Sequence, residues 1–240
     1  MRVVGVIPCR YASSRFPGKP LALINNKPMM WHVYQRCLES GVLNEVYIAT
    51  DDDRIELEAN KLGLNAVMTY GKHATGTDRV AEVAGVIKSD YYVNIQGDEP
   101  LIDPDAIKLV SKAIVNCADP LVQATNAYAP LTDPSDIIDT NVVKVITDAE
   151  NNALAYSRHP IPFPKAGRAS FSRQLGLYAF KRSGLQIFSE QLPQYLETVE
   201  GVEMYRLLEH GFRIKMIETN DDSVSVDTMD DLIRLQSIMK

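Results

Sequence analysis

A basic loop directly after the first apolar stretch has the composition of an anion site. Three cations and three small residues share ten positions there: Arg10, Ser13, Ser14, Arg15, Gly18 and Lys19. Small residues let the backbone approach an anion closely, and three cations can spread over a triphosphate. The loop is not a Walker loop, since Pro20 stands where Ser or Thr is required. We expect it to bind a nucleoside triphosphate, and the alternative is a solvated surface turn.

Two carboxylates follow apolar strands at separate places in the chain. Asp98 comes after the strand 91–95, with Gly97 allowing a close approach, and Asp227 lies on the loop after the strand 214–217. Mg²⁺ takes few protein oxygens and completes its octahedron with water and phosphate. Asp98 and Asp227 are therefore the predicted metal ligands. The alternative is that they cap the helices that follow, as acids do near a helix start.

The elements that must position these residues alternate between strands and helices in the first half. Strands are predicted at 3–7, 46–49, 66–68 and 91–95, and helices at 29–40, 54–62, 78–87 and 104–115. Strands without a polar face, separated by helices, indicate an α/β fold with a mainly parallel sheet covered on both faces. The loops at the carboxyl ends of its strands should carry the site.

The second half has a different pattern. Strands are predicted at 122–127, 142–146 and 175–180, and helices near 183–190 and 199–210. We interpret about 122–212 as a smaller mixed lobe for substrate and dimer contacts within a single domain, 1–240. A strand at 214–217 and a helix at 230–239 are expected to return the chain to the main sheet.

Composition excludes several classes of protein. The formal net charge of −6 argues against a nucleic-acid binder, which needs a surplus of cations. The first apolar run is too short for a signal peptide, and no 18-residue apolar run follows, so we expect no membrane segment and a cytoplasmic location. Cys9, Cys37 and Cys117 show neither disulfide nor zinc spacing.

Seven motifs, taken in order, carry a family resemblance over nearly the whole chain. They are IPCRYASSRFPGKPL at 7–21, ATDDDRI at 49–55, VMTYGKHATGTDR at 67–79, VNIQGDEPLI at 93–102, NVVKV at 141–145, YSRHPIPF at 156–163 and SVSVDTMDDL at 223–232. The chain resembles the 3-deoxy-manno-octulosonate cytidylyltransferases, or CMP-Kdo synthetases. The resemblance implies a nucleotide-diphospho-sugar transferase (Rossmann-like) fold, a homodimer, CTP as donor and Mg²⁺.

The resemblance also implies roles for single residues. It places Arg10, Ser14, Arg15 and Lys19 on the CTP phosphates, and His73, Thr75, Gly76 and Gln96 around cytosine and ribose. It places Asp98 and Asp227 on metal, and Arg79, Arg158, Tyr178 and Glu203 at the acidic sugar. We expect the anomeric hydroxyl to attack the α-phosphorus while the basic loop neutralises the departing pyrophosphate. For Arg158, the alternative is an ion pair that fixes its proline-rich loop.

Several positions depart from the family pattern. Gln174 stands where His is usual and Met204 where Gln is usual, and both family residues face the sugar. Either the pocket repacks around the same acid, or it prefers another ulosonate. Cys9, Thr75 and Ser225 replace Ala, Ser and Gly. Met204 could instead belong with Tyr205 and Leu208 to a dimer surface, because Met204 and Leu208 share one helical face.

Two other classes of function compete with this reading. A nucleotide-sensing protein without turnover would not need both metal carboxylates. A transferase of UTP or dTTP to neutral sugars predicts a glycine-rich loop after the first strand, which this sequence lacks.

Overall fold

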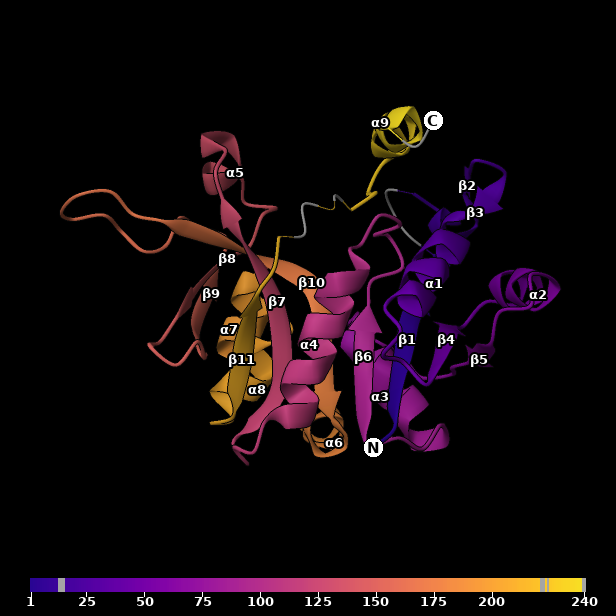
Figure 1. The fold of residues 1–240 in the computed structure, drawn as a ribbon, viewed down its shortest axis with the longest axis horizontal. Helices are drawn as coiled ribbons and strands as arrows, with labels where there is room; N and C mark the ends of the chain where they lie inside the picture. Colours follow the sequence, from indigo (N-terminus) through magenta and orange to yellow (C-terminus); the bar gives the residue numbers. More distant parts are fainter. Residues whose placement is uncertain (13–15, 221–222, 224, 239–240) are drawn as a thin grey trace.

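The computed structural model of the chain describes residues 1–12, 16–220, 223 and 225–238. Its main sheet has the strand order β11-β7-β10-β6-β1-β4-β5 (Figure 1). The strands are β1 (Val3–Cys9), β4 (Glu45–Thr50), β5 (Ala66–Met68), β6 (Tyr91–Ile95), β7 (Val122–Leu131), β10 (Phe171–Lys181) and β11 (Arg213–Glu218), with β8 (Lys144–Thr147) and β9 (Ala153–Ser157) attached through β10. A separate hairpin joins β2 (Leu23–Ile24) to β3 (Lys27–Pro28).

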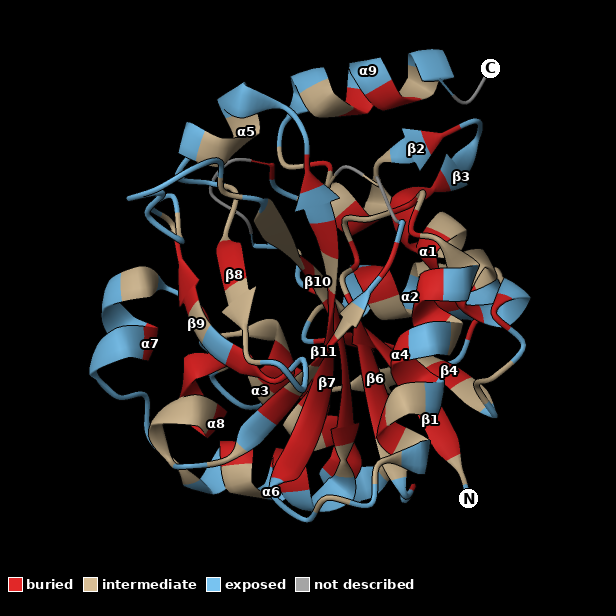
Figure 2. Ribbon diagram, turned by 60° about the vertical axis from the view of Figure 1, so that its left-hand side comes forward, coloured by how far each residue is buried: buried red, intermediate tan, exposed pale blue. Residues whose placement is uncertain are grey.

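The parallel half of the sheet is as predicted. β1 pairs in parallel with both β4 and β6, and β5 extends this set. Chain alternation sends Val3, Ile7 and Cys9 to one core and Val4 and Val6 to the other, so β1 has no polar face and is covered on both sides (Figure 2).

Helices cover both faces, as expected. Buried side chains of α1 (Met29–Glu39), α2 (Asp53–Lys61) and α4 (Pro104–Asn116) join the first core. Those of α3 (Gly76–Val86), α6 (Arg182–Glu190) and α8 (Tyr205–Glu209) join the second. The remaining helical segments are η1 (Lys19–Leu21), α5 (Pro134–Ile138), α7 (Tyr195–Glu200) and α9 (Met229–Ile238).

The second half departs from the prediction in three places. β10 runs antiparallel between β6 and β7, so strands of the 122–212 segment continue the main sheet. The helix predicted at 199–210 is two short helices, because Gly201 adopts a left-handed φ of 62° and ends α7. α5 and β9 were not predicted.

The chain end agrees with expectation in its strand but not in its helix. β11 returns the chain to the main sheet, where it pairs with β7 at the far edge. α9 then crosses back and buries Leu232 and Leu235 against Phe16, Ile24 and Met29. It therefore packs on the N-terminal loop region rather than on a face of the sheet (Figure 1). No helix among the described residues is long and apolar enough to span a bilayer.

Candidate active site

The first cavity lies at the carboxyl ends of the parallel strands and has a volume of about 340 Å³. It is lined by Pro8, Arg10, Lys19, Pro20, His73, Ala74, Thr75, Gly76, Arg79, Gln96, Gly97, Asp98 and Asp227. Eight residues were predicted for triphosphate and base, and six of them lie on this cavity together with both predicted metal ligands: Arg10, Lys19, His73, Thr75, Gly76, Gln96, Asp98 and Asp227. Ser14 and Arg15, like Ser13, lie outside the described residues.

The basic loop is shaped by local backbone geometry. Gly18 has a φ of 71°, a left-handed value that favours glycine, and its N–H donates to the Tyr11 carbonyl at 2.9 Å. The turn is followed directly by Lys19 at the start of η1. The turn therefore places the Lys19 side chain at the carboxyl ends of the strands, on the wall of the first cavity. A solvated surface turn would not need this placement.

The Lys19 ammonium lies between the two predicted metal ligands. Its Nζ is 2.7 Å from Asp98 Oδ2 and 3.3 Å from Asp227 Oδ1. The Val226 N–H donates to the Asp98 carbonyl at 2.8 Å, which fixes the residue before Asp227 against the turn after β6. Two carboxylates from distant parts of the sequence therefore converge on one cationic group.

Other residues make the capping hydrogen bonds that the described part of the chain shows at the two following helices. Asp103 caps α4 by accepting from Asp105 N. At α9, the Asp231 carboxylate accepts from the backbone of Asp227 and Thr228, and the Thr228 hydroxyl accepts from Asp231 N. The capping alternative is therefore wrong for the side chains of Asp98 and Asp227.

Gly97 is required for a reason other than the predicted approach of a ligand. A Cβ there would lie 2.9 Å from the Pro8 carbonyl oxygen and 3.0 Å from Cys9 Sγ. The turn that presents Asp98 therefore packs directly on the end of β1. Burial, together with the nearby charge of Asp98, raises the pKa of the Cys9 thiol to about 12, so Cys9 is an inert packing residue.

His73 is fixed at the wall of the first cavity by Glu82 of α3. Glu82 Oε2 is 2.7 Å from His73 Nε2, and the same carboxylate accepts from the backbone N–H groups of Tyr70 and Gly71. Burial acts to raise the pKa of Glu82, but these donors outweigh it and lower the pKa. His73 Nδ1 is buried without a partner among the described residues.

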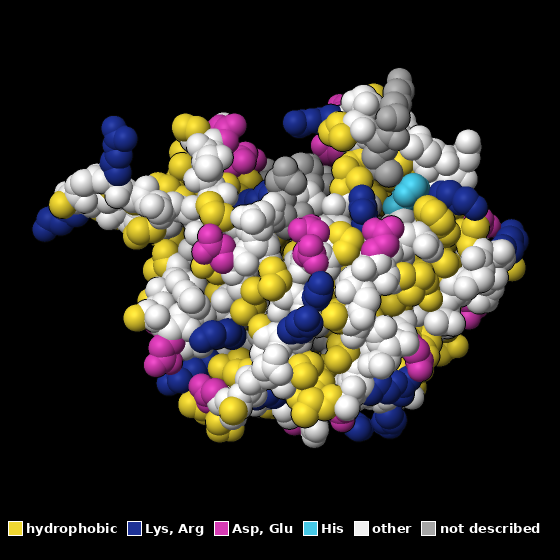
Figure 3. Space-filling view, viewed as in Figure 1, with side chains coloured by type: hydrophobic (Ala, Val, Ile, Leu, Met, Phe, Trp, Pro, Cys, Tyr) yellow, Lys and Arg dark blue, Asp and Glu magenta, His cyan; other side chains and the backbone are white. Residues whose placement is uncertain are grey.

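The second cavity adjoins the first and has a volume of about 970 Å³. Its walls come from β10, the α7–α8 turn, α5 and α9, and the surface is hollowed between α5 and α9 (Figure 3). Of the six residues predicted to face an acidic sugar, it contains three: Gln174, Tyr178 and Glu203. The two cavities share Ala74, Thr75 and Asp227.

Tyr178 and Gln174 form a polar pair on this wall. Gln174 Nε2 donates to the Tyr178 hydroxyl at 3.1 Å, and burial raises the pKa of Tyr178 well above its ordinary value. The phenol is therefore neutral and keeps its hydrogen for donation.

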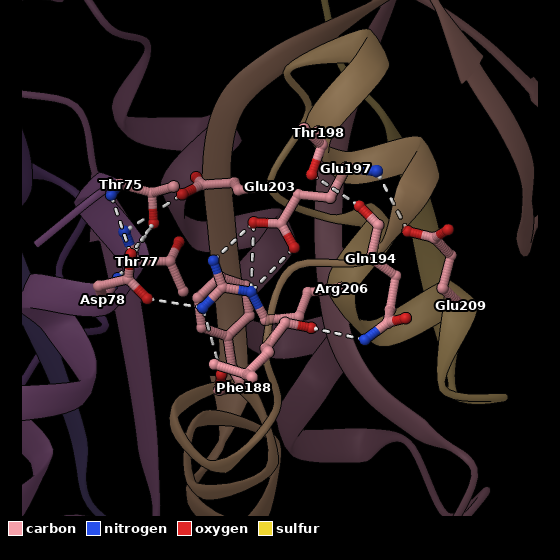
Figure 4. A network of polar contacts seen from close by, with 11 residues as sticks. Thr75, Thr77, Asp78, Phe188, Gln194, Glu197, Thr198, Glu203, Arg206 and Glu209 are labelled. Carbon is pink, nitrogen blue, oxygen red and sulfur yellow. Dashed lines mark hydrogen bonds and ion pairs between the residues drawn. The ribbon is translucent and has the colours of Figure 1, made fainter.

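Glu203 belongs to a buried polar network that joins the α7–α8 segment to α3 (Figure 4). Its carboxylate accepts from Thr77 N at 3.2 Å. Burial raises the pKa of Glu203, although hydrogen bonds from Thr75 and Thr77 favour the charged form. Thr75 is also the N-cap of α3 in a capping box with Asp78.

Arg206 is the centre of this network and was not predicted. Its guanidinium, with the residue only 3% exposed, is 2.6 Å from Asp78 Oδ1 and 2.5 Å from Glu197 Oε1, and it stacks on Phe188 at 3.9 Å. The Thr75-x-x-Asp78 spacing of a capping box was visible in the sequence. The pairing of Asp78 with Arg206, 128 positions away, left no local pattern.

Three predicted sugar contacts do not line the second cavity. Met204 is fully buried in the second core, and Tyr205 is buried with it, its hydroxyl accepting from Tyr156 N. Met204 is therefore neither a pocket residue nor a dimer surface, and its prediction as a substrate contact is wrong. Tyr205 and Leu207 of α8 are buried in the same core.

The two arginines are also held elsewhere. Arg79 lines the first cavity, where its guanidinium pairs with Asp51 at 2.9 Å. Arg158 lines neither cavity and donates to the carbonyls of Glu200 and Thr140 at 2.7 and 2.8 Å. The alternative that Arg158 fixes its loop describes this geometry, although its partners are carbonyls rather than a carboxylate.

The fold and this pair of cavities define the class as an α/β nucleotidyltransferase. A family model described as "Cytidylyltransferase" matches residues 4–217. The chain belongs to the cytidylyltransferase family, among the 3-deoxy-manno-octulosonate cytidylyltransferases. Membership of a family of enzymes favours turnover over the nucleotide-sensing alternative.

Curated relatives and solved structures support this assignment. The 3-deoxy-manno-octulosonate cytidylyltransferase of Pelobacter propionicus is 42% identical over 98% of this chain and 96% of its own length. That of Solibacter usitatus is 43% identical over 100% and 95%. A solved CMP:2-keto-3-deoxy-manno-octonic acid synthetase complexed with CTP matches with a TM-score of 0.94 and 36% identity, covering 100% of this chain and 98% of that one.

A more distant structure shows the fold alone. A putative glucose-1-phosphate thymidylyltransferase from Bacillus anthracis has a TM-score of 0.68 at 16% identity, over 98% of this chain and 94% of that one.

Proposed function

We propose that this chain transfers CMP from CTP to the anomeric hydroxyl of 3-deoxy-manno-octulosonate and releases pyrophosphate, with Mg²⁺ as its metal. The observation that carries the proposal is that two cavities meet at Ala74, Thr75 and Asp227, beside the carboxylate pair. The identity of the two substrates comes from the family relationship, because the names of the relatives contain the acid sugar and CTP. A donor in the first cavity and an acceptor in the second would bring their reacting groups together at this junction.

The donor set suits Mg²⁺. Asp98 and Asp227 already converge on one ammonium group, so their oxygens can face a single cation. No group of three or more His, Cys, Asp or Glu side chains among the described residues could hold a metal. Mg²⁺ accepts such a sparse set, because it takes its other oxygens from water and phosphate.

The chain's own residues account for positioning and charge. Arg10 and Lys19 would neutralise the departing pyrophosphate, while His73, Thr75, Gly76 and Gln96 would hold the nucleoside end of the donor. Tyr178 and Gln174 would donate hydrogen bonds to the acceptor. Bound to Asp98 and Asp227, Mg²⁺ would polarise the α-phosphate and favour loss of the hydroxyl proton.

Of the two departures from the family pattern that could change the choice of acceptor, only one lines the second cavity. Gln174 faces the second cavity, whereas Met204 does not. An amide can hydrogen-bond a hydroxyl as an imidazole can, so Gln174 is compatible with the same acid sugar.

An acceptor panel tests this assignment. Pyrophosphate release from CTP is measured in the presence of Mg²⁺ with a panel of 2-keto-3-deoxy acids that includes the 8-amino relative of 3-deoxy-manno-octulosonate. The value of kcat/KM should be highest with 3-deoxy-manno-octulosonate. Gln174→His is the matched variant and should keep the same order of preference. A higher kcat/KM for another ulosonate would overturn the acceptor assignment.

We also propose that the chain forms a homodimer, as the sequence resemblance implies, and that it acts in the cytoplasm. The loop at 158–170 projects from the body with Phe163 84% exposed, which offers an apolar contact beyond the monomer's core (Figure 1). Light scattering should give twice the chain mass of 26.8 kDa. A monomer at micromolar concentration would contradict the dimer.

A further inference from the structure

Lys19 contacts the two carboxylates that are proposed to bind the metal, although its own proposed role is to bind phosphate. The proposed function, on which this inference rests, uses Lys19 to bind phosphate and uses Asp98 and Asp227 to bind metal. In the structure the lysine instead bonds to both carboxylates, at 2.7 and 3.3 Å. Its side chain is only 15% exposed, so the contact lies inside the first cavity rather than on the outer surface.

The contact places one cationic group where a metal would need to approach. Two carboxylates that converge repel one another, and an ammonium between them removes much of that repulsion. A divalent cation that used the same Asp98 Oδ2 and Asp227 Oδ1 would have to displace the ammonium. Part of the metal's binding free energy would therefore be lost in breaking the two contacts.

The lysine is suited to exchanging partners. Its charge sits on a flexible four-carbon stem with three rotatable donors. The neighbouring wall contains Arg10, so a triphosphate drawn to this end of the cavity would offer the ammonium new anionic oxygens. Its departure would leave the two carboxylates for the metal.

We propose that Lys19 is an internal competitor of the metal, which keeps the carboxylate pair weak for divalent cations until a triphosphate takes up the lysine. Removal of Lys19 should therefore strengthen metal binding in the absence of nucleotide. A lysine that only attracts phosphate would leave nucleotide-free metal affinity unchanged, apart from its effect on the general charge of the cavity.

Mn²⁺ titration followed by the electron paramagnetic resonance of the free ion tests this directly. Without CTP or sugar, Lys19→Met should bind Mn²⁺ about tenfold more tightly than the natural chain. Arg10→Met is the matched control, because it removes the same charge from the same cavity, and it should change the affinity by no more than about threefold. Adding Asp98→Asn to Lys19→Met should abolish the gain.

Each outcome decides the proposal. Equal or weaker Mn²⁺ binding by Lys19→Met overturns it, as does an equal gain in Arg10→Met or a gain that survives Asp98→Asn. Thermal melts confirm that each variant is folded. Since the titration contains neither CTP nor acceptor, it can fail while the proposed transfer reaction stands, and the reaction can fail while the competition is observed.

Discussion

At the residue scale, the site depends on carboxyl groups whose surroundings give them different tasks. Asp98 and Asp227 face a cation in an open cavity, whereas Asp103 and Asp231 hold helix starts. Glu203 is part-buried at the wall of the second cavity, and this desolvation raises its pKa. The sequence placed Asp98 and Asp227 correctly after strands. It could not distinguish a carboxylate that faces the cavity from one that caps a helix, because residues of both kinds lie between a strand and a helix.

Asp98 and Asp103 make a matched pair of substitutions. Asp98→Asn should lower kcat by about 10²-fold or more at saturating Mg²⁺, because it removes a predicted metal oxygen. Asp103→Asn should leave kcat near normal, since Asn also caps helices well. Steady-state kinetics on both variants checks this, and near-normal turnover of Asp98→Asn would refute the metal assignment.

Glu203 should make stability depend on pH. Its pKa in the folded chain lies above the ordinary value of 4.5, so the folded state holds the proton more tightly than the unfolded state. The free energy of unfolding therefore falls as pH rises from about 4.5 through the raised pKa. Glu203→Gln lacks this loss, and its stability relative to the natural chain should increase with pH over that window. Parallel profiles in denaturant titrations would show that Glu203 does not titrate there.

At the element scale, the spacing of apolar residues predicted the strands and helices that form from local sequence. The apolar runs of β1, β4, β5 and β6 identified the parallel half. The insertion of β10 between β6 and β7 was not predicted, because pairing between distant strands leaves no periodic signal. The break at Gly201 was missed because the apolar spacing continues across it, and the buried partners of Arg206 come from α3 and α7.

Gly97 tests how the end of β1 positions the turn after β6. In Gly97→Ala the added Cβ would meet a backbone oxygen at 2.9 Å, so the turn carrying Asp98 must shift. We expect kcat/KM to fall about tenfold or more. Gly85→Ala in α3 is the control, because a Cβ there meets nothing within 4 Å, and it should keep activity while gaining about 0.5–1 kcal/mol of stability. Equal activity in the two variants would contradict this packing role.

Met204 tests whether α8 contributes a core or a pocket. Met204→Gln should lower the free energy of unfolding by about 1–3 kcal/mol, because it buries an amide without a designed partner. Met204→Leu nearly conserves volume and should change it by less than about 1.5 kcal/mol. Denaturant titration measures both. A Gln variant of unchanged stability but altered acceptor preference would return Met204 to the pocket.

At the scale of the whole molecule, the connection between β11 and α9 passes the site. β11 is at one edge of the sheet, and α9 packs near the opposite side on the N-terminal loop region (Figure 1). Asp227 lies on the connection between them and borders both cavities. Folding of the complete chain is therefore needed to bring the second carboxylate to the first.

The most direct test of the account is the identity of the product. The natural chain, incubated with CTP, Mg²⁺ and 3-deoxy-manno-octulosonate, should form a CMP-sugar phosphodiester and pyrophosphate in equal amounts, as followed by ³¹P nuclear magnetic resonance. UTP in place of CTP should give far less product. Hydrolysis of CTP to CMP without a phosphodiester, or no consumption of CTP, would contradict transfer to an acceptor in the second cavity.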